Sequence, residues 1–460
     1  MAESSYDCIV IGSGPGGYVG AIRAAQLGMR TAVVESDRIG GRCLNYACIP
    51  AKAVLRVADV LSEIRDAGDF GISVPAPEVD FAAVGARRER VVKTLTGGVA
   101  GLFKKNGIDV IEGHGSVTDD GNVKVGGNFD GTEIAATTVI IATGSVPRPL
   151  PGTQFGGRVI GTEEAWALPQ LPSALAVVGA GASGTEVASA YARLGSDVTL
   201  YEALDRVLPT EDADISKLAD RAFKKQGIAV RSGVFVEDVR AGADAVTYTV
   251  AGEPQQADWL VIAAGRGPDT DGLGLAEAGI ALTDGGLVAV DGALRTSLAG
   301  VYAIGDLVPG PALAHKASDE GIISAEDAAG LETHPIEYVD IPRATFCYPN
   351  VGSFGLTEQQ ARDAGHDVVV GKLPYGAVGA GTVYGDRSGL VKVVGERTNG
   401  ELLGGHIVGS RATELIQELV NVRALEGGFA EVARIVHGHP TLSEAVMEAA
   451  RDASGWLIHG

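Results

Sequence analysis

The sequence has little that would suit an exported, membrane-spanning or nucleic-acid-binding protein. Its 460 residues include only four cysteines, far too few for the disulfide framework of a secreted protein. Basic residues number 37 against 58 acidic ones, and the formal net charge of -21 disfavours nucleic acid and anionic membrane surfaces as partners. No apolar run is long enough to cross a bilayer, and residues 1–7 lack the pattern of a targeting segment. We therefore expect a cytoplasmic protein of a prokaryote, or equally a processed organelle protein.

Length and composition predict several folded domains. A chain of 460 residues is too long for one hydrophobic core and is expected to divide into about three domains. Hydrophobic residues make up 45% of the chain, which is enough to fill large cores and disfavours disorder.

A glycine-rich loop near the N-terminus stands in the context that dinucleotide-binding proteins use. A short apolar strand, Cys8–Ile11, leads into Gly12–Gly17, which contains the pattern Gly-x-Gly-x-x-Gly. A helix is expected over 18–27 and a strand over 31–34, ending at Glu35. The glycines let the backbone approach a pyrophosphate at the N-terminus of the helix, and the acid accepts a ribose hydroxyl.

The same motif occurs a second time. A strand at 176–178 leads into Gly179–Gly184, and a helix to Leu194, a strand at 198–201 and Glu202 follow. One offset relates the landmarks of the two motifs: Gly12 to Gly179, Gly14 to Gly181, Gly17 to Gly184 and Glu35 to Glu202. Two loops that merely turn would not keep the acid in register. The repeat therefore predicts two βαβ units, and with them two dinucleotides or a duplicated domain.

The remaining segments predict how these units are completed. Apolar strands over 138–144 and 260–265 end in glycine and close the two units, while 117–137 and 234–258 alternate like antiparallel excursions. A new domain of strands and helices begins at Ile341. We predict an α/β fold with two Rossmann-like dinucleotide-binding domains and a C-terminal α+β domain, with boundaries at 1–148, 149–270, 271–341 (a return to the first domain) and 342–460.

Two cysteines five positions apart form the segment around which the chain is organised. If this segment is helical, Cys43 and Cys48 lie a little more than one turn apart, and a disulfide requires a distorted first turn. Two buried apolar helix residues are the simpler interpretation. Zinc would need two further ligands, and none lies nearby in the sequence. The pair alone leaves this open; the two nucleotide motifs and a His-Pro near the C-terminus favour redox chemistry.

From about Tyr6 to Glu448 the sequence resembles the flavin disulfide reductases with a C-x4-C redox pair. These belong to the class I pyridine nucleotide-disulfide oxidoreductases, and the dihydrolipoamide dehydrogenases among them are the most similar. The matching pieces are Gly12–Gly17, Gly40-Gly41-x-Cys43 through Cys48-Ile49-Pro50, Ala142–Gly144, Gly179–Gly184, Ala303–Asp306, Leu313–Ala317 and His437–Glu444. The last piece is the most telling, and the chain ends without the paired-cysteine tail of mercuric reductases.

The resemblance implies an enzyme that passes electrons from dihydrolipoyl thiols to a Cys43–Cys48 disulfide, then to FAD and NAD+. It implies a homodimer whose partner subunit supplies the acid/base. The lipoyl group would be carried by a protein of a 2-oxoacid dehydrogenase or glycine cleavage complex. Cys48 would lie next to the flavin and Cys43 would exchange with substrate. The implied catalytic residues are Cys43, Cys48, the acid/base His439, Glu444 which orients it, and Lys52 and Glu186, which would pair near the flavin.

The resemblance also implies a set of cofactor contacts. For FAD, Asp306 would hold the ribityl chain. The other residues expected to bind a cofactor are Gly12, Gly14, Pro15, Gly17, Glu35, Gly41, Arg42, Lys52, Gly115, Thr143, Gly144, Gly179, Gly181, Gly184, Glu186, Glu202, Gly265, Leu313, Ala314 and His315. Glu202 favours NAD over NADP because a carboxylate repels a ribose phosphate, although Arg206 four residues on weighs against this. No metal is expected.

The segment around Cys43 and Cys48 departs at four positions from the sequence that is usual in the family. Arg42 stands where Thr is usual, Tyr46-Ala47 where Val-Gly is usual, and Ala51 where Ser is usual. Arg42 would lower the pKa of the neighbouring thiol, and Tyr46 would narrow the approach to the disulfide, unless the changes are silent. Two alternatives therefore stay open: a flavin disulfide reductase that acts on another small or protein disulfide, and a flavin-binding subunit with little turnover.

Overall fold

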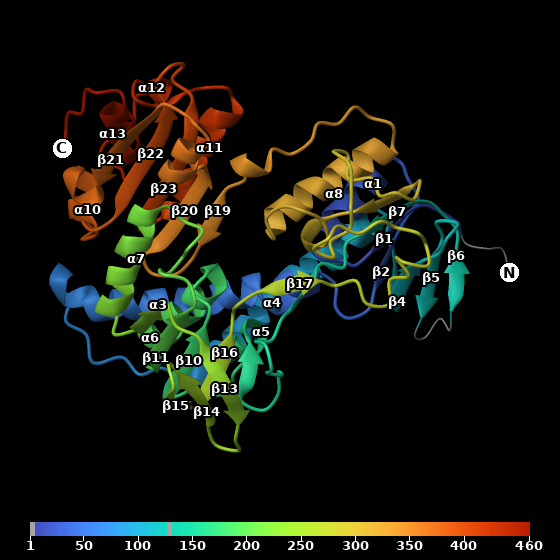
Figure 1. Ribbon diagram of the computed structural model, residues 1–460, viewed down its shortest axis with the longest axis horizontal. Helices are drawn as coiled ribbons and strands as arrows, with labels where there is room; N and C mark the ends of the chain where they lie inside the picture. Colours follow the sequence, from blue (N-terminus) through green and yellow to red (C-terminus); the bar gives the residue numbers. More distant parts are fainter. Residues whose placement is uncertain (1–4, 127–130) are drawn as a thin grey trace. The chain divides into compact units, whose positions relative to one another are not determined.

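The computed structural model describes residues 5–126 and 131–460, and the described chain folds into two units (Figure 1). Each unit is assembled from segments that are far apart in the sequence. Unit 1 comprises Ala83–Arg148, Gly265–Tyr338 and the described residues up to Ala53. Unit 2 comprises Val54–Ala82, Pro149–Ala264 and Val339–Gly460. No helix within the described ranges is long and apolar enough to cross a membrane.

Unit 1 is built on a five-stranded parallel sheet with the order β18-β7-β1-β2-β3. Four of its strands are largely buried and apolar because helices cover a parallel sheet on both faces, whereas the edge strand β3 is mostly exposed. The strands are Tyr6–Ile11 (β1), Thr31–Glu35 (β2), Asp109–Glu112 (β3), Ala136–Ile141 (β7) and Val301–Ala303 (β18). A small antiparallel sheet, expected between 117 and 137, consists of His114–Val117 (β4), Val123–Gly126 (β5) and Thr132–Ile134 (β6).

Two helices of unit 1 pack closely because glycines line their contact. Helix α1, Pro15–Gln26, begins three residues earlier than the sequence predicted, since Pro15 fits the first turn of a helix. It lies against α8, Ala314–Ala328 (Figure 1). A Cβ on Gly321 would lie 2.4 Å from the carbonyl oxygen of Gly16. The backbones touch there, and no larger residue fits without moving a helix.

Unit 2 repeats the parallel design and adds a second sheet. The parallel sheet has the order β12-β11-β10-β16-β9, and the antiparallel excursion predicted at 234–258 is present. The strands are Val159–Gly161 (β9), Ala174–Val178 (β10), Asp197–Glu202 (β11), Ala229–Ser232 (β12), Val236–Ala241 (β13), Val246–Val250 (β14), Glu253–Ala257 (β15) and Trp259–Ile262 (β16). The helices are Thr162–Ala165 (α5), Ala182–Leu194 (α6) and Ala213–Lys225 (α7).

The C-terminal part of unit 2 is an antiparallel sheet with the order β19-β20-β23-β22-β21. Helix α11 packs on β20 and β23, and α13 packs on β21 and β22. The strands are Arg343–Thr345 (β19), Asn350–Gly355 (β20), Val368–Pro374 (β21), Leu390–Glu396 (β22) and Leu402–Gly409 (β23). The helices are Glu358–Asp363 (α9), Gly379–Val383 (α10), Ala412–Ala424 (α11), Phe429–Val432 (α12) and Glu444–Ala453 (α13). Cys347 is buried in the loop after β19.

Two long helices lie where the sequence analysis placed no element. They are α3, Cys48–Arg65, and α4, Phe81–Lys105. In α4 the buried residues Val84, Val92, Val99 and Phe103 recur at helical spacing. A short pair of strands, Ser145–Pro147 (β8) and Arg266–Pro268 (β17), runs antiparallel where the chain leaves unit 1 and returns to it.

Candidate redox and nucleotide-binding site

The first glycine loop is folded tightly against the sheet and leaves one face open. Gly12 has a φ of +95°, and a Cβ there would lie 2.6 Å from the carbonyl oxygen of Ala142. A Cβ on Gly17 would lie 2.0 Å from the oxygen of Gly12. By contrast, a Cβ on Gly14 would meet nothing within 4 Å. Space at Gly14 beside the N-terminus of α1 fits a pyrophosphate, the group expected there.

Glu35 lies at the end of β2, where it closes this loop. One carboxylate oxygen, Oε2, accepts hydrogen bonds from the backbone N of Ser13 at 2.9 Å and from its hydroxyl at 2.5 Å. The other oxygen accepts from the N of Asp37 at 2.9 Å. The Ser13 hydroxyl also accepts from the N of Gly40 at 3.1 Å. Ser13 thus joins the acid to the segment that carries the cysteines, a contact that the sequence analysis missed although Ser13 stands inside the motif.

The helix that carries the cysteines is interrupted between them. Helix α2, Gly41–Asn45, ends at Tyr46, whose φ of -130° is not helical, and α3 begins at Cys48. This interruption is the distortion that a bond between the two sulfurs requires. Both cysteines are in the thiol form, and their side chains are hydrogen-bonded to each other. The predicted disulfide is the oxidised form of this pair and stays a prediction.

Charges around Cys43 act in opposite directions on its thiol. The hydrogen bond with Cys48 and burial raise the pKa of Cys43 above its ordinary value, whereas the positive charges of Lys52 and Arg42 lower it. On balance the pKa of the Cys43 thiol is raised while the pair is reduced. When the sulfurs are joined, the hydrogen bond is absent and only the two cations remain to favour a thiolate leaving group.

Further predicted contacts of the first nucleotide gather at the ends of the parallel strands of unit 1. Asp306 follows β18 in a 3-10 turn and accepts a hydrogen bond from the Ser145 hydroxyl, which in turn accepts from Arg266 Nε at 2.8 Å. The hydroxyl of Thr143 donates to the carbonyl of Asp269 at 2.7 Å. The other expected cofactor contacts are placed as follows: Gly144 at positive φ, Leu313, Ala314 and His315 at the N-terminus of α8, and Gly115 packed on Ile11. Gly265, which was expected to end the strand that closes the second nucleotide unit, also has a positive φ.

The second glycine loop reproduces the first in unit 2. Gly179 has a φ of +101°, and a Cβ on Gly184 would lie 1.8 Å from the oxygen of Gly179. A Cβ on Gly181 would again meet nothing within 4 Å. Glu202 Oε2 accepts a hydrogen bond from the N of Ala180 at 2.6 Å. A second dinucleotide fits this loop for the same physical reasons as the first.

Two residues near the second loop bear on the choice and the placing of the nicotinamide nucleotide. Arg206 donates from Nη2 to the carbonyl of Pro209 at 3.1 Å. Glu186 on α6 is 5% exposed and accepts a hydrogen bond from the N of Phe346 at 2.9 Å. Lys52 is half-buried on α3 in unit 1. The pairing of Lys52 with Glu186 stays a prediction.

His439 and Glu444 form an oriented pair in unit 2. The ring Nδ1 lies 2.9 Å from Glu444 Oε1, and the second carboxylate oxygen accepts from the N of Thr441 at 2.8 Å. Burial raises the pKa of Glu444, but the hydrogen bonds from Thr441 and His439 outweigh it and hold the pKa below its usual value. A charged carboxylate keeps the proton on Nδ1, so that Nε2 is left to accept one. The His439 side chain is 75% exposed.

The neighbouring histidine has a separate role. His437 Nε2 lies 2.5 Å from Glu418 Oε1, and its Nδ1 lies 2.9 Å from the carbonyl oxygen of Ile435. Both ring nitrogens of His437 are therefore engaged by groups other than His439. The cis peptide bond between His439 and Pro440 belongs to the same turn. Within the described ranges, no group of three or more His, Cys, Asp or Glu side chains is arranged to hold a metal ion.

Comparison with known proteins identifies the family. The model of the pyridine nucleotide-disulphide oxidoreductase family matches residues 6–321, and the model of its dimerisation domain matches residues 341–450. The chain belongs to this family. Its members include curated dihydrolipoyl dehydrogenases, of which that of Mycobacterium tuberculosis is 44% identical over 461 residues, covering 99% of both chains. That of Rhizobium etli is 42% identical over all of both chains, and one from Bacillus subtilis is 41% identical over 98% of this chain and 97% of its own.

Solved structures agree with the family. LpdA from Mycobacterium tuberculosis superposes with a TM-score of 0.90 at 29% identity and covers 96% of this chain and 99% of its own. A Cu(II) complex of RclA, an HOCl-induced flavoprotein disulfide reductase from Escherichia coli, superposes with a TM-score of 0.87 at 27% identity, over 97% and 99%. Family membership confirms the predicted α/β fold, the enzyme class of a dithiol/disulfide oxidoreductase and its cofactors FAD and NAD.

Proposed function

We propose that this chain oxidises protein-bound dihydrolipoamide to lipoamide and reduces NAD+ to NADH, the dihydrolipoyl dehydrogenase reaction. The observation that carries the proposal is full-length similarity to proteins of that name in a chain that retains both cysteines and the His439–Glu444 pair. FAD, when bound, accepts an electron pair from the reduced cysteines and delivers it to NAD+. The remaining chemistry belongs to side chains of the chain itself.

Thiol exchange would begin at the outer cysteine. A substrate thiolate attacks Cys43 Sγ in the disulfide, a new S–S bond forms, and Cys48 leaves as a thiolate. The second substrate thiol then attacks the substrate sulfur that is bonded to Cys43. The bond to Cys43 breaks, lipoamide is released, and Cys43 is left reduced. His439 Nε2 accepts the proton of the attacking thiol, as a base held in one tautomer by Glu444. Lys52 and Arg42 favour the thiolate of Cys43 by their positive charge.

The exposure of the His439 segment supports the homodimer in which one subunit completes the site of the other. The family model of a dimerisation domain covers this part of the chain. In the same domain large apolar side chains are open to solvent: Leu425 is 83% exposed, and Ile435 and Val436, which precede His439 in the sequence, are 48% and 95% exposed. A second copy would bury them in a two-fold interface, which supplies the acid/base twice.

The remaining assignments accompany this proposal. FAD would be bound by 1–148 with 271–341, NAD by 149–270, and the partner subunit by 342–460. The site residues act as predicted from the family resemblance. The second partner would be a lipoyl-bearing protein of a 2-oxoacid dehydrogenase or glycine cleavage complex, and the compartment the cytoplasm.

A second candidate function is reduction of a different disulfide by the same machinery. The observation that favours it is Tyr46, which lies between the two cysteines. Its hydroxyl donates to Asp37 at 2.6 Å, and the Arg38 guanidinium lies 5.7 Å from the centre of its ring. These contacts hold a large ring in the redox segment. The structural similarity to RclA, named as a flavoprotein disulfide reductase, supports the same alternative.

The decisive experiment is anaerobic reduction of the purified yellow protein with dihydrolipoamide, followed by NAD+. We expect a long-wavelength absorption band from a thiolate beside the flavin, and then NADH at the rate of steady-state turnover. The band with NADH but not with dihydrolipoamide would favour the second candidate. No band with either reductant, in protein that holds FAD, would reject the redox role of the cysteines. A Cys48→Ser variant that retains FAD serves as the matched control.

A further inference from the structure

A fully buried ion pair lies on α8 in unit 1, away from the cysteines in the sequence. Lys316 Nζ and Glu320 Oε1 are 3.0 Å apart, and neither side chain is exposed to solvent. Buried ion pairs are expensive to desolvate, and apolar residues of the same size often stabilise a protein more. The residues that this pair contacts indicate a reason for it other than stability.

Both members of the pair hold the backbone of one residue, Gly305. Its N–H donates to Glu320 Oε2 at 2.7 Å, and its carbonyl oxygen accepts from Lys316 Nζ at 2.8 Å. That carbonyl belongs to the peptide bond that joins Gly305 to Asp306. Gly305 has a φ of +74°, which glycine adopts easily because it has no side chain. Its hydrogen bonds to Glu320 and Lys316 therefore fix the orientation of this peptide. The pair therefore sets the direction in which the chain enters Asp306.

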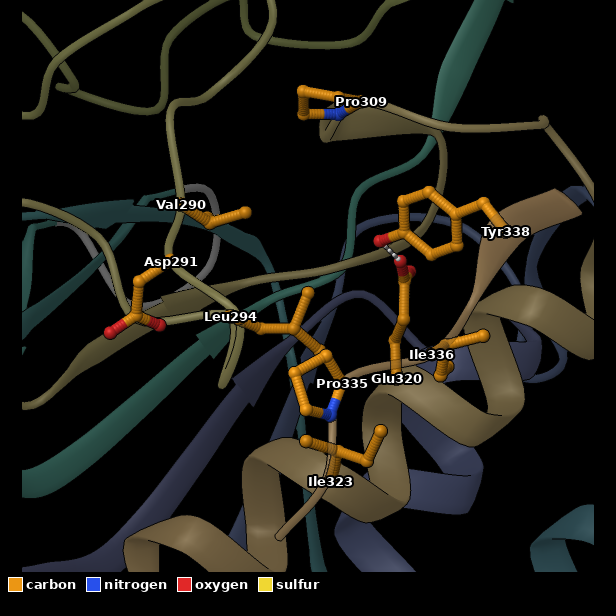
Figure 2. A pocket seen from close by; sticks show the side chains of 10 residues that line it. Val290, Asp291, Leu294, Pro309, Glu320, Ile323, Pro335, Ile336 and Tyr338 are labelled. Carbon is orange, nitrogen blue, oxygen red and sulfur yellow. Dashed lines mark hydrogen bonds between the residues drawn. The ribbon is translucent and has the colours of Figure 1, made fainter. Parts of the chain in front are cut away.

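A tyrosine, Tyr338, contacts both members of the ion pair. The hydroxyl of Tyr338 donates to Glu320 Oε1 at 2.5 Å (Figure 2). Lys316 Nζ lies 5.3 Å from the centre of the Tyr338 ring. Burial, and then the hydrogen bond to Glu320, raise the pKa of Tyr338, so that its hydroxyl remains a donor at all physiological pH values. Tyr338 is the last residue of unit 1.

The cavity beside these residues is too small to explain them as a ligand site. It has a volume of about 250 Å³ and is lined mainly by aliphatic side chains such as Leu294, Ile323 and Pro335, with Glu320 and Tyr338 at one wall (Figure 2). Typical small-molecule pockets begin at about 300 Å³. The hydrogen bonds of Glu320 are made to protein groups, namely Gly305, Tyr338 and Lys316.

We propose that Lys316, Glu320 and Tyr338 are positioning residues for FAD, which act by fixing the Gly305–Asp306 peptide so that Asp306 holds the cofactor. The inference rests on the role of Asp306 under the proposed function. The Asp306 carboxylate is held independently by Ser145, so the aspartate is fixed from its side chain and from its backbone. Loosening the backbone end reduces the affinity for FAD without removing any group that touches it.

The test is titration of the apoprotein of the full chain with FAD, followed by flavin fluorescence. We expect Tyr338→Phe to raise the Kd for FAD about fivefold and Glu320→Gln about tenfold or more, because each removes a hydrogen bond to or from a buried charge. Glu326→Gln is the matched control. This residue is on the same helix and is paired with Arg23 at 2.6 Å, and its variant should change the Kd less than twofold.

A double-mutant cycle separates positioning from general stability. In an Asp306→Ala background, Tyr338→Phe should no longer alter the Kd for FAD, because the residue it acts through is gone. An equal effect of Tyr338→Phe in both backgrounds, or no effect of Tyr338→Phe in the wild type, would overturn the proposal. Tyr338→Phe keeps the test decisive even if Glu320→Gln does not fold. The readout is FAD affinity, so a failure to oxidise dihydrolipoamide would count against the proposed function alone.

Discussion

The two nucleotide-binding repeats use the same hydrogen bonds around their acids. In the first, Glu35 accepts from the N of Ser13 and from the N of Asp37. In the second, Glu202 accepts from the N of Ala180 at 2.6 Å and from the N of Leu204 at 2.9 Å. Each acid therefore holds the residue after the first glycine and the residue two positions after itself. The repeat in the sequence is a repeat of this small network.

What differs is the segment that follows each acid. In the first repeat the Ser13 hydroxyl also reaches Gly40, and a Cβ on Gly41 would lie 2.7 Å from the Cα of Gly14. The start of the redox helix is thus packed directly on the phosphate-binding loop. The second repeat has Ala180, without a hydroxyl, at the equivalent place. On the proposed function, the first repeat would hold its nucleotide beside the redox cysteines, and the second would bind a nucleotide alone.

Helix packing follows the same division. The first-repeat helix α1 meets α8 through glycine backbones, whereas α6 of the second repeat is backed by aromatic rings. Tyr191 of α6 has its ring 6.3 Å from that of Trp166, and its hydroxyl donates to the carbonyl of Ala165. Close backbone packing in the first repeat holds α8, with Lys316 and Glu320, against α1.

The largest effect is expected from a substitution at the cysteine pair, which follows only the first repeat. Cys48→Ser should lower turnover with dihydrolipoamide and NAD+ by at least about 10³-fold, because no disulfide can form. FAD content should be unchanged, as judged from the absorption spectrum. Cys8→Ala, in the buried strand β1, is the control and should retain turnover. Turnover in Cys48→Ser close to that of the wild type would show that the two repeats do not differ in redox function.

Alanine at the third glycine should break each repeat separately. The added Cβ would lie 2.0 Å from Gly12 O in Gly17→Ala and 1.8 Å from Gly179 O in Gly184→Ala, so the loop must move. We expect Gly17→Ala to be purified without FAD. Gly184→Ala should keep FAD and its reduction by dihydrolipoamide, with KM for NAD+ raised by about 10²-fold. Loss of FAD from Gly184→Ala would contradict the assignment of the two loops.

A smaller effect is expected when the second acid loses its charge. Glu202→Gln should raise KM for NAD+ about tenfold and narrow the preference over NADP+ by a similar factor, because the repulsion of a ribose phosphate is removed. Steady-state kinetics with both nucleotides measure this. Glu35→Gln is the matched change in the first repeat and should alter FAD affinity while leaving nucleotide preference as it was. A changed preference in Glu35→Gln would argue against the pairing of acids with cofactors.

The smallest effect is expected from a substitution that gives the first repeat the alanine of the second. Ser13→Ala removes the hydroxyl that joins Glu35 to Gly40, and we expect a rise of about threefold in the Kd for FAD. Ala180→Ser is the reciprocal change and should leave the KM for NAD+ within about twofold, since no redox segment follows Glu202. Fluorescence titration and steady-state kinetics provide the two values. A larger effect of Ala180→Ser than of Ser13→Ala would reverse the comparison.

Local patterns were sufficient to predict both repeats, because each motif is contiguous and its acid stands at a fixed distance. The sequence also predicted that a new domain of strands and helices begins at Ile341, and the first strand of the antiparallel sheet begins at Arg343. The need for a distorted turn between the cysteines followed from helix geometry, and the break at Tyr46 meets it.

Contacts between distant segments were not predictable in this way. No local pattern indicates that Lys316 and Glu320 enclose Gly305, or that Tyr338 joins them. The hydroxyl of Ser13 similarly acquires its role only when β2 and the loop after it return to the glycine loop. Helix α4 had a detectable helical spacing of buried residues, but it carries no motif, so the sequence analysis passed over it.

The exposure of His439 has a consequence for mixtures of inactive variants. On the proposed dimer, a subunit with Cys48→Ser and a subunit with His439→Gln each carry the part that the other lacks. Refolded together, they would form heterodimers. In these, the cysteines of the His439→Gln subunit and the His439 of the Cys48→Ser subunit make one intact centre, so the mixture would recover part of the wild-type activity. Each variant alone would stay inactive at any concentration. The activity recovered would show that His439, exposed in the single subunit, acts in the active centre of the other subunit. It would also measure the number of intact active centres per dimer.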